Sequence, residues 1–255
     1  MSFDAPAARY DRYMGRYSRR LAPLLAAFAG VELGMRALDA GCGPGALAAH
    51  LAGLLGPGHV AAADPSEPFV AACAERVPGA DVRRAGAESL PWADGSFDAV
   101  LSQLAVNFLA DPGQGVRELR RVARAGGVVA ACTWDYRERM EMLAVFWGAA
   151  LTLDPAAPAE GVRMRFATPG ELRGLWTDAG LRGVETGGLE VEEEYASFDD
   201  YWEPFTAGVG PAGSYCASLT ADAREALRAE CRRRLGDPTG RFRLRARAWA
   251  VRGGA

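Results

Sequence analysis

Lysine, histidine and paired cysteines are what this sequence of 255 residues has least of. It contains no lysine, so its basic residues are all arginine, a bias typical of a skewed genomic base composition that indicates no chemistry. The two histidines, His50 and His59, argue against a histidine-based metal site, although carboxylate sites stay open. The cysteines show no short paired spacing, so we expect free thiols and neither a zinc site nor a disulfide framework: Cys42, Cys73, Cys132, Cys216 and Cys231.

The sequence also lacks a basic-then-apolar signal segment and any apolar run long enough to span a membrane. We therefore expect a cytoplasmic protein that does not insert into membranes. The net charge of −3 and an isoelectric point near 5.6 argue against nucleic acid as a partner. Because 49% of the residues are hydrophobic, the chain can bury a sizeable core, and we expect one domain over residues 1–255.

Short apolar strands alternate with helical segments in the first half of the chain. A helix is expected at 9–29, where large apolar residues recur at three- and four-residue steps, and the order β-α-β-α-β-β-α-β follows it. Such alternation predicts a mostly parallel sheet with helices on both faces. Asp39, Asp64 and Gln103 each close a predicted strand, so their side chains should converge on one edge of the sheet.

Two charged strands are predicted near the end of the chain, at 181–195 and 241–252. A glutamate stripe lies along one face of the first strand and an arginine stripe along one face of the second. We expect antiparallel pairing, with the stripes forming cross-strand ion pairs; the alternative is an arginine clamp for an anionic substrate. The stripes are Glu190, Glu192 and Glu194, and Arg241, Arg243, Arg245 and Arg247.

The turn after the first predicted strand reads DAGCGPG, from Asp39 to Gly45. Glycines permit positive φ and let a ligand approach the backbone, and the helix that follows offers free N–H groups. A dinucleotide site needs the spacing G-x-G-x-x-G, whereas the spacing here is G-x-G-x-G. Asp39 repels a pyrophosphate and attracts a cation. The turn therefore favours S-adenosylmethionine (SAM), which carries a sulfonium, an ammonium and no phosphate, over a nicotinamide dinucleotide.

Four motif-like segments follow one another between residues 36 and 135: LDAGCGPG, AAADPSEPFVAAC, GAESLPWADGSFDAVLSQLAVNFLADP and RVARAGGVVAACTW. Together they resemble the motifs of class I SAM-dependent methyltransferases, most closely the branch of ubiquinone- and menaquinone-biosynthesis and small-molecule enzymes. The resemblance implies a Rossmann-like α/β fold, doubly wound, with a mostly parallel seven-stranded sheet, an antiparallel strand near the C-terminus and helical additions. It also implies a methyltransferase that uses SAM and releases S-adenosylhomocysteine.

The resemblance implies a cofactor-binding role for each matching position. Asp39 would lie at the methionine end of SAM, and Asp64 would accept hydrogen bonds from the ribose hydroxyls. Many relatives have Gly-Asp before the Ala-Glu pair; here either Glu88 replaces that aspartate beside the adenine, or the contact is backbone only. Tyr10 and Arg16 are expected over the cofactor carboxylate, with core packing as the alternative for Tyr10. The expected set is Tyr10, Arg16, Asp39, Gly41, Cys42, Gly43, Asp64, Pro65, Ser66, Ala87, Glu88 and Gln103.

A general base is less evident than the cofactor site. Alignment and exclusion of water supply much of the rate of methyl transfer, and only an acceptor such as an alkyl hydroxyl benefits from a base. The candidates for orienting or deprotonating an acceptor are Asp135 and Tyr136, after the fifth predicted strand, and Asn107, after the fourth. The alternatives are a solvated loop carboxylate for Asp135 and a turn cap for Asn107.

Helical additions are expected at 136–165 and 196–240, around Phe146, Trp147, Trp202 and Phe205. These aromatics either form a lid over an apolar pocket or pack as core. A lid implies a small, largely apolar methyl acceptor. Two other functions stay open: a protein that binds SAM without methylating, and a nicotinamide oxidoreductase. The patterns indicate neither the methylated atom nor the oligomeric state.

Overall fold

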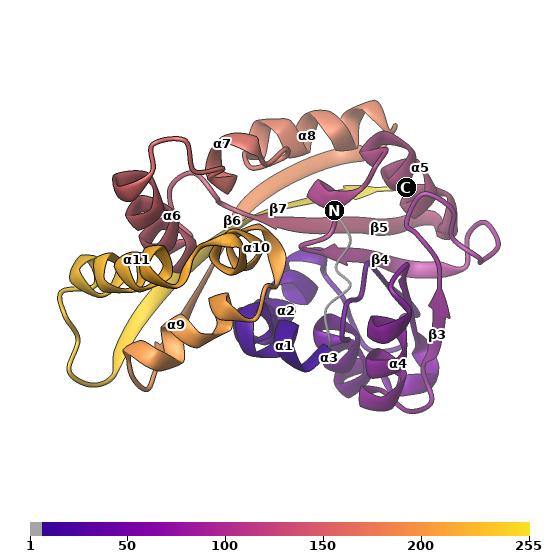
Figure 1. Cartoon of the computed structure of the whole chain (residues 1–255). Coiled ribbons are helices and arrows are strands. Elements are labelled where there is room, and N and C mark those ends of the chain that lie inside the picture. The colour runs from indigo at the N-terminus through magenta and orange to yellow at the C-terminus, as the bar shows by residue number, and fades with distance from the viewer. Residues whose placement is uncertain (1–6) are drawn as a thin grey trace.

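A seven-stranded sheet organises the protein, and the computed structural model describes residues 7–255 (Figure 1). The strand order is β3-β2-β1-β4-β5-β7-β6, with β7 antiparallel to both neighbours and the pairs from β3 to β5 parallel. This arrangement confirms the predicted fold class. The strands are β1 Ala37–Ala40, β2 Val60–Asp64, β3 Asp81–Arg84, β4 Phe97–Gln103, β5 Ala123–Trp134, β6 Arg182–Tyr195 and β7 Phe242–Gly254.

Helices cover both faces of the sheet, and each face has its own apolar cluster. Leu25 of α2 and Leu51 of α3 are buried in one cluster, and Leu119 of α5 and Trp176 of α8 in the other, so α2 and α8 lie on opposite sides (Figure 1). No helix among residues 7–255 is long and apolar enough to cross a membrane. The α-helices are α1 Ala7–Tyr10, α2 Arg16–Ala29, α3 Ala46–Leu55, α4 Glu67–Arg76, α5 Pro112–Val122, α6 Glu141–Leu153, α7 Glu160–Arg163, α8 Pro169–Asp178, α9 Phe198–Thr206, α10 Gly210–Ser218 and α11 Ala221–Arg234.

The N-terminal helical segment contains a π-helical stretch, Asp11–Gly15, between α1 and α2. π-Helical turns widen the helix and are frequent at functional sites. Tyr13 and Met14 from this stretch are buried. The periodicity of 9–29 predicts a helix but not this turn, because a single wide turn barely changes a three- and four-residue recurrence.

The helices of the second half gather beyond one end of the sheet, where α6, α9, α10 and α11 lie together (Figure 1). Phe146 of α6 stacks on Phe205 of α9 with ring centroids 4.4 Å apart. Both rings, Trp147 and Trp202 are buried. These four aromatics therefore contribute to the core, since apolar area removed from water stabilises the fold.

The charge stripes of β6 and β7 face each other as predicted. Glu194 pairs with Arg241 and Arg243, and Glu192 pairs with Arg243 and Arg245, over distances of 2.9–3.4 Å. The predicted cross-strand ion pairs are thus confirmed. Exposed pairs of this kind contribute little individually, but they match the register that β6 and β7 adopt.

The last arginine of the stripe has a different partner. Arg247 lies opposite Glu190 in the register, yet its guanidinium binds Asp135, with Nε 3.0 Å from Oδ2. Asp135 is 2% exposed and also accepts the backbone N–H groups of Arg137 and Glu138. Asp135 is therefore not the solvated loop carboxylate considered from the sequence. It is a buried anion that depends on one arginine.

Replacing Arg247 should destabilise the fold far more than replacing Arg243. Arg247→Met leaves the Asp135 carboxylate buried without its cation, which we expect to cost about 3 kcal/mol. Arg243→Met removes a side chain that is 64% exposed and should cost under about 1 kcal/mol. Urea unfolding monitored by circular dichroism measures both. Equal losses would show that Asp135 does not need its partner.

Candidate functional site

The glycine turn after β1 adopts backbone conformations that its sequence permits. Gly41, Gly43 and Gly45 have φ of +77°, +52° and +88°, in the left-handed region that favours glycine. A Cβ on Gly41 would overlap Cβ of Ala105, whereas one on Gly43 would meet nothing within 4 Å. Backbone conformation and close packing thus both require glycine at Gly41, whereas Gly43 borders open space.

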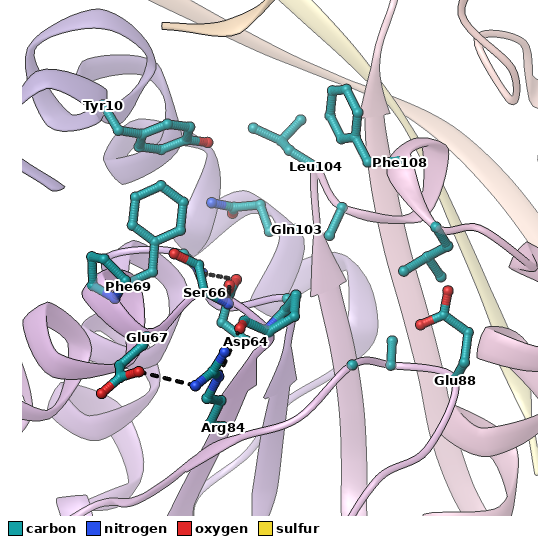
Figure 2. A pocket seen from close by; sticks show the side chains of 18 residues that line it. Tyr10, Asp64, Ser66, Glu67, Phe69, Arg84, Glu88, Gln103, Leu104 and Phe108 are labelled. Carbon is teal, nitrogen blue, oxygen red and sulfur yellow. Dashed lines mark hydrogen bonds and ion pairs between the residues drawn. The ribbon is translucent and has the colours of Figure 1, made fainter. Parts of the chain in front are cut away.

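A cavity of about 480 Å³ opens at the carboxyl ends of β1, β2 and β4, beneath Tyr10 (Figure 2). Most residues of the expected cofactor set line it, although they come from five separate stretches of chain. They are Tyr10, Gly41, Gly43, Asp64, Pro65, Ser66, Ala87, Glu88 and Gln103. The parallel sheet brings these residues together because its strands end at one edge.

Asp64 forms hydrogen bonds with two loops that border the cavity. Its Oδ2 accepts the backbone N–H of Gly43 and its Oδ1 accepts that of Ser66, both at 2.9 Å. Burial raises the pKa of this carboxyl, and the two amides lower it in part. Each oxygen keeps a further lone pair, so the carboxylate can still accept hydrogen bonds from a ligand.

Asp39 and Gln103 present unsatisfied oxygens next to the large cavity. Asp39 is fully buried; its Oδ2 accepts the N–H of Ala48 at 2.9 Å, whereas its Oδ1 has no partner. Gln103 donates to the carbonyl of Ser18, and its Oε1 also lacks a partner. Burial raises the pKa of Asp39 to about 7, helped by the nearby charge of Asp64. Both residues line a small adjoining cavity of about 20 Å³.

Ser66, Ala87 and Glu88 also line the large cavity. Ser66 Oγ is buried without a hydrogen-bond partner. One oxygen of Glu88 accepts the N–H of Ala110 at 3.0 Å, which turns this half-buried carboxylate toward the loop after β4. At the rim, Glu67 pairs with Arg84 at 2.9 Å (Figure 2).

Leu104 is a cavity residue that sequence reasoning missed. It follows β4 directly and has a φ of +62°, a conformation that is costly for a branched side chain and often marks a functional site. Its N–H donates to the carbonyl of Cys132 at 2.9 Å, which holds the strained turn in place. Apolar side chains give no local sign of such strain, so no pattern in the sequence could have indicated it.

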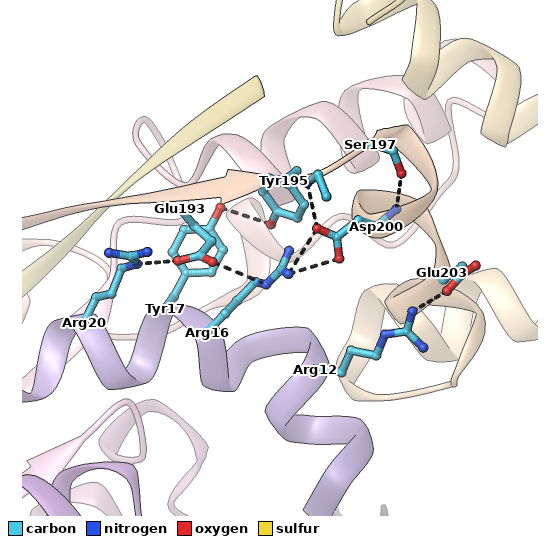
Figure 3. Close-up of polar contacts among 10 residues, drawn as sticks. Arg12, Arg16, Tyr17, Arg20, Glu193, Tyr195, Ser197, Asp200 and Glu203 are labelled. Carbon is cyan, nitrogen blue, oxygen red and sulfur yellow. Dashed lines mark hydrogen bonds and ion pairs between the residues drawn. The ribbon is translucent and has the colours of Figure 1, made fainter. Parts of the chain in front are cut away.

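Arg16 and Cys42 do not line the large cavity. Arg16 of α2 points to β6 and α9, where it pairs with Asp200 at 3.0 Å and lies over the Tyr195 ring (Figure 3). The expected contact between Arg16 and a cofactor carboxylate is therefore not supported, since its charge is used between helices. Cys42 lines the small cavity beside Asp39 instead.

A second cavity, of about 30 Å³, adjoins the first and shares Tyr10, Leu104 and Phe108 with it. Its other walls are mainly apolar and aromatic: Tyr13, Met14, Trp134, Tyr136, Leu143, Glu160, Gly210 and Pro211. Of the acceptor-site candidates, Tyr136 lines it, Asn107 is buried next to Tyr136, and Asp135 is turned away toward Arg247. Glu160 was not singled out from the sequence, because a loop glutamate is normally solvated.

Comparison with known proteins finds similarity to methyltransferases, mainly in the first half of the chain. Residues 38–131 match the family described as "Methyltransferase domain". Malonyl-[acyl-carrier protein] O-methyltransferase of Pseudescherichia vulneris is 37% identical over 134 residues, which are 52% of this chain and 51% of that protein. "Probable phthiotriol/phenolphthiotriol dimycocerosates methyltransferase 2" of Mycobacterium ulcerans is 34% identical over 144 residues, 56% of this chain and 53% of that protein.

Among solved structures, YcgJ of Bacillus subtilis aligns with a TM-score of 0.59 over 92% of this chain and 97% of that one. Its sequence identity of 17% makes this a likeness of fold alone. The chain spans about half the length of the curated relatives that it matches.

The glycine turn predicts a contrast between two alanine substitutions. Gly41→Ala combines a left-handed backbone with overlap at Ala105 and should lower the free energy of unfolding by about 3 kcal/mol. Gly43→Ala has only the backbone cost, about 1 kcal/mol. Urea unfolding decides between them. If the two losses match, the contact with Ala105 does not constrain the turn.

Proposed function

We propose that the protein is a class I SAM-dependent methyltransferase that binds SAM in the large cavity and methylates a small, largely apolar molecule. The match of residues 38–131 to the family described as "Methyltransferase domain" supports this proposal. The single observation that carries this proposal is the convergence of Asp64 and Gln103 on that cavity, and of Asp39 on the small cavity that adjoins it, beside the glycine turn. The bound cofactor supplies an activated methyl group. Holding that group in line with the acceptor and excluding water are then the tasks of the protein.

The residues present fit the methionine end of this cofactor. Asp39 Oδ1 and Gln103 Oε1 are buried acceptors without partners, and such atoms are costly unless a ligand or water satisfies them. An ammonium or another N–H donor is a suitable partner for both. A phosphate is not, because the Asp39 and Asp64 carboxylates would repel it.

The residues also fit the nucleoside end. We assign the ribose hydroxyls to Asp64, whose two oxygens keep free lone pairs while backbone amides hold the carboxylate in place. Pro65, Ser66, Ala87 and Glu88 line the part of the cavity left for the adenine. With Glu88 already accepting from Ala110, its second oxygen is the one available to the adenine amino group.

We assign residues 136–165 and 196–240 to the cover over the acceptor side. Two features support this assignment: α6, α7 and α10 supply Leu143, Glu160 and Pro211 to the second cavity, and the walls of that cavity are mainly apolar. An apolar wall selects an apolar acceptor because polar groups lose hydration there without compensation. Tyr136 and Asn107 are the proposed polar contacts to the acceptor.

Methyl transfer is tested by incubating the protein with methyl-labelled SAM and a small-molecule extract of cells that produce it. Mass spectrometry of the labelled product identifies the acceptor. Binding of SAM without any labelled product, across extracts from several growth conditions, would favour a SAM-binding protein that does not methylate.

Asp64→Ala should weaken binding of S-adenosylhomocysteine by at least about 30-fold, because hydrogen bonds to a charged acceptor are lost. Asp64→Asn, which keeps one acceptor oxygen, should show a smaller loss. Asp94→Ala, which removes a carboxylate that is 81% exposed on the surface, is the control. Isothermal titration calorimetry measures all three affinities. An unchanged affinity in Asp64→Ala would show that the ribose lies elsewhere.

Binding should also depend on pH through Asp39. Its pKa of about 7 in the free protein means that a cationic ligand must displace a proton below that pH. The affinity for S-adenosylhomocysteine should then fall by up to about tenfold for each pH unit below 7. Titrations in buffers of different ionisation enthalpy should detect the released proton. Asp39→Asn should bind more weakly and remove this dependence; a native protein with no pH dependence would contradict the assignment.

A further inference from the structure

Glu160 is a buried carboxylate that the proposed cofactor contacts do not use. It opens the short helix α7, is 4% exposed, and its Oε2 has no hydrogen-bond partner. It lines the second cavity. A buried acceptor that the fold leaves unsatisfied is costly, so a group that enters the cavity is its natural partner.

No described residue that lines the cavity around Glu160 is a cation that could neutralise it. Among the described residues that line the second cavity, Glu160 is the only charged one. The titratable neighbours are Tyr10 on α1, Tyr13 on the π-helical stretch and Tyr136 after β5. Burial raises the pKa of each hydroxyl, that of Tyr10 to about 12, so all three stay neutral near pH 7.

Burial also raises the pKa of Glu160 to about 7, and the Trp147 indole N–H and the Ala212 amide lower it only in part. These two groups come from α6 and α10, and neither of them is titratable. A proton acceptor works best when its pKa lies near the working pH. The environment therefore suits a group that takes up and releases a proton.

The second cavity has room for little more than the reacting end of an acceptor. Its volume of about 30 Å³ suits a hydroxyl or one or two waters. Tyr10, Leu104 and Phe108 separate it from the cavity assigned to the cofactor while lining both. Glu160 thus faces the side from which an acceptor meets the methyl group.

We propose that Glu160 accepts the proton of an uncharged, hydroxyl-bearing methyl acceptor, an alcohol or a phenol. The inference rests on the proposed function. As the new oxygen–carbon bond forms, the sulfur–carbon bond breaks and its electron pair stays on sulfur, while the hydroxyl proton passes to Glu160. The carboxylate and the sulfonium both become neutral, so the apolar cavity holds no net charge after the step.

An acceptor that is itself a carboxylate does not fit this cavity. It would place a second anion beside Glu160 with no cation among the lining residues, and like charges at close range disfavour ionisation of both. The same lining offers a hydroxyl an acceptor in Glu160 and polar neighbours in Tyr13 and Tyr136. The cavity therefore selects for the hydroxyl.

The test compares native protein with Glu160→Gln, Glu160→Asp and a control, Glu225→Gln, which alters an exposed glutamate of α11. The probe is methyl-labelled SAM with an organic-solvent extract of the producing cells. Mass spectrometry and NMR of the product identify the methylated atom. With that acceptor, kcat and KM are measured from about pH 5.5 to pH 9, alongside S-adenosylhomocysteine affinity and Tm.

We expect methylation of a hydroxyl oxygen, and a native kcat that rises with pH through about 7 as Glu160 loses its proton. Glu160→Gln should lower kcat at least about 100-fold, change KM by less than about threefold, and lose the rise near pH 7. Glu160→Asp should recover part of the rate. Cofactor affinity should be unchanged, and the Tm of Glu160→Gln at pH 8 should not fall, because a buried unpaired charge is removed.

A methylated carboxylate, amine or carbon would overturn the inference, as would a Glu160→Gln protein with native kcat and pH profile. A lower Tm together with a uniform loss at every pH would assign Glu160 a structural role instead. Native protein that binds no S-adenosylhomocysteine and transfers no label would contradict the proposed function itself. The two failures are therefore distinguishable.

Discussion

The site depends on two carboxylates that hold backbone amides at the carboxyl edge of the sheet. Asp64 bonds the N–H groups of Gly43 and Ser66, and Asp39 bonds that of Ala48 in the first turn of α3. The loop after β1 is thereby fixed to β2 and to the helix that follows it. Asp64 also lines the large cavity and Asp39 the small cavity beside it, so a single set of bonds supplies both the geometry and the charge of the site.

The acidic residues of this protein include two contrasting groups. The glutamates of the β6 stripe and Asp135 have arginine partners, so their charge is balanced within the fold. Asp39 and Glu160 instead lie buried with an unpartnered oxygen each, and burial raises the pKa of both to about 7. Perturbed pKa values without a structural partner tend to mark functional sites.

The N-terminal helical segment is held in place by charges from distant parts of the chain. Arg12 binds Glu203, Arg16 binds Asp200, Arg20 binds Glu193, and the Tyr17 hydroxyl meets that of Tyr195 (Figure 3). These contacts join the segment to β6 and α9. They position Tyr10 and the π-helical stretch over the two cavities. Arg16 therefore has a structural role, which the sequence around it did not indicate.

The sequence by itself determined the alternation of strands and helices, the glycine turn, and the placement of Asp39, Asp64 and Gln103 at strand ends. Those features are local: strand length, period and turn chemistry specify them, and a parallel sheet brings strand ends together whatever the rest of the chain does. The charge stripes of β6 and β7 could be predicted for the same reason, since a period of two determines which side chains share a face of a strand.

Only the tertiary structure decided which charges have partners. Arg16 binds Asp200 where a cofactor carboxylate was expected, and Arg247 binds Asp135 where the glutamate stripe was expected, because packing sets which groups lie within reach. The strain at Leu104 and the burial of Glu160 also arise from contacts between segments far apart in the chain. Burial and ionisation depend on all of the surrounding elements at once, which no local pattern contains.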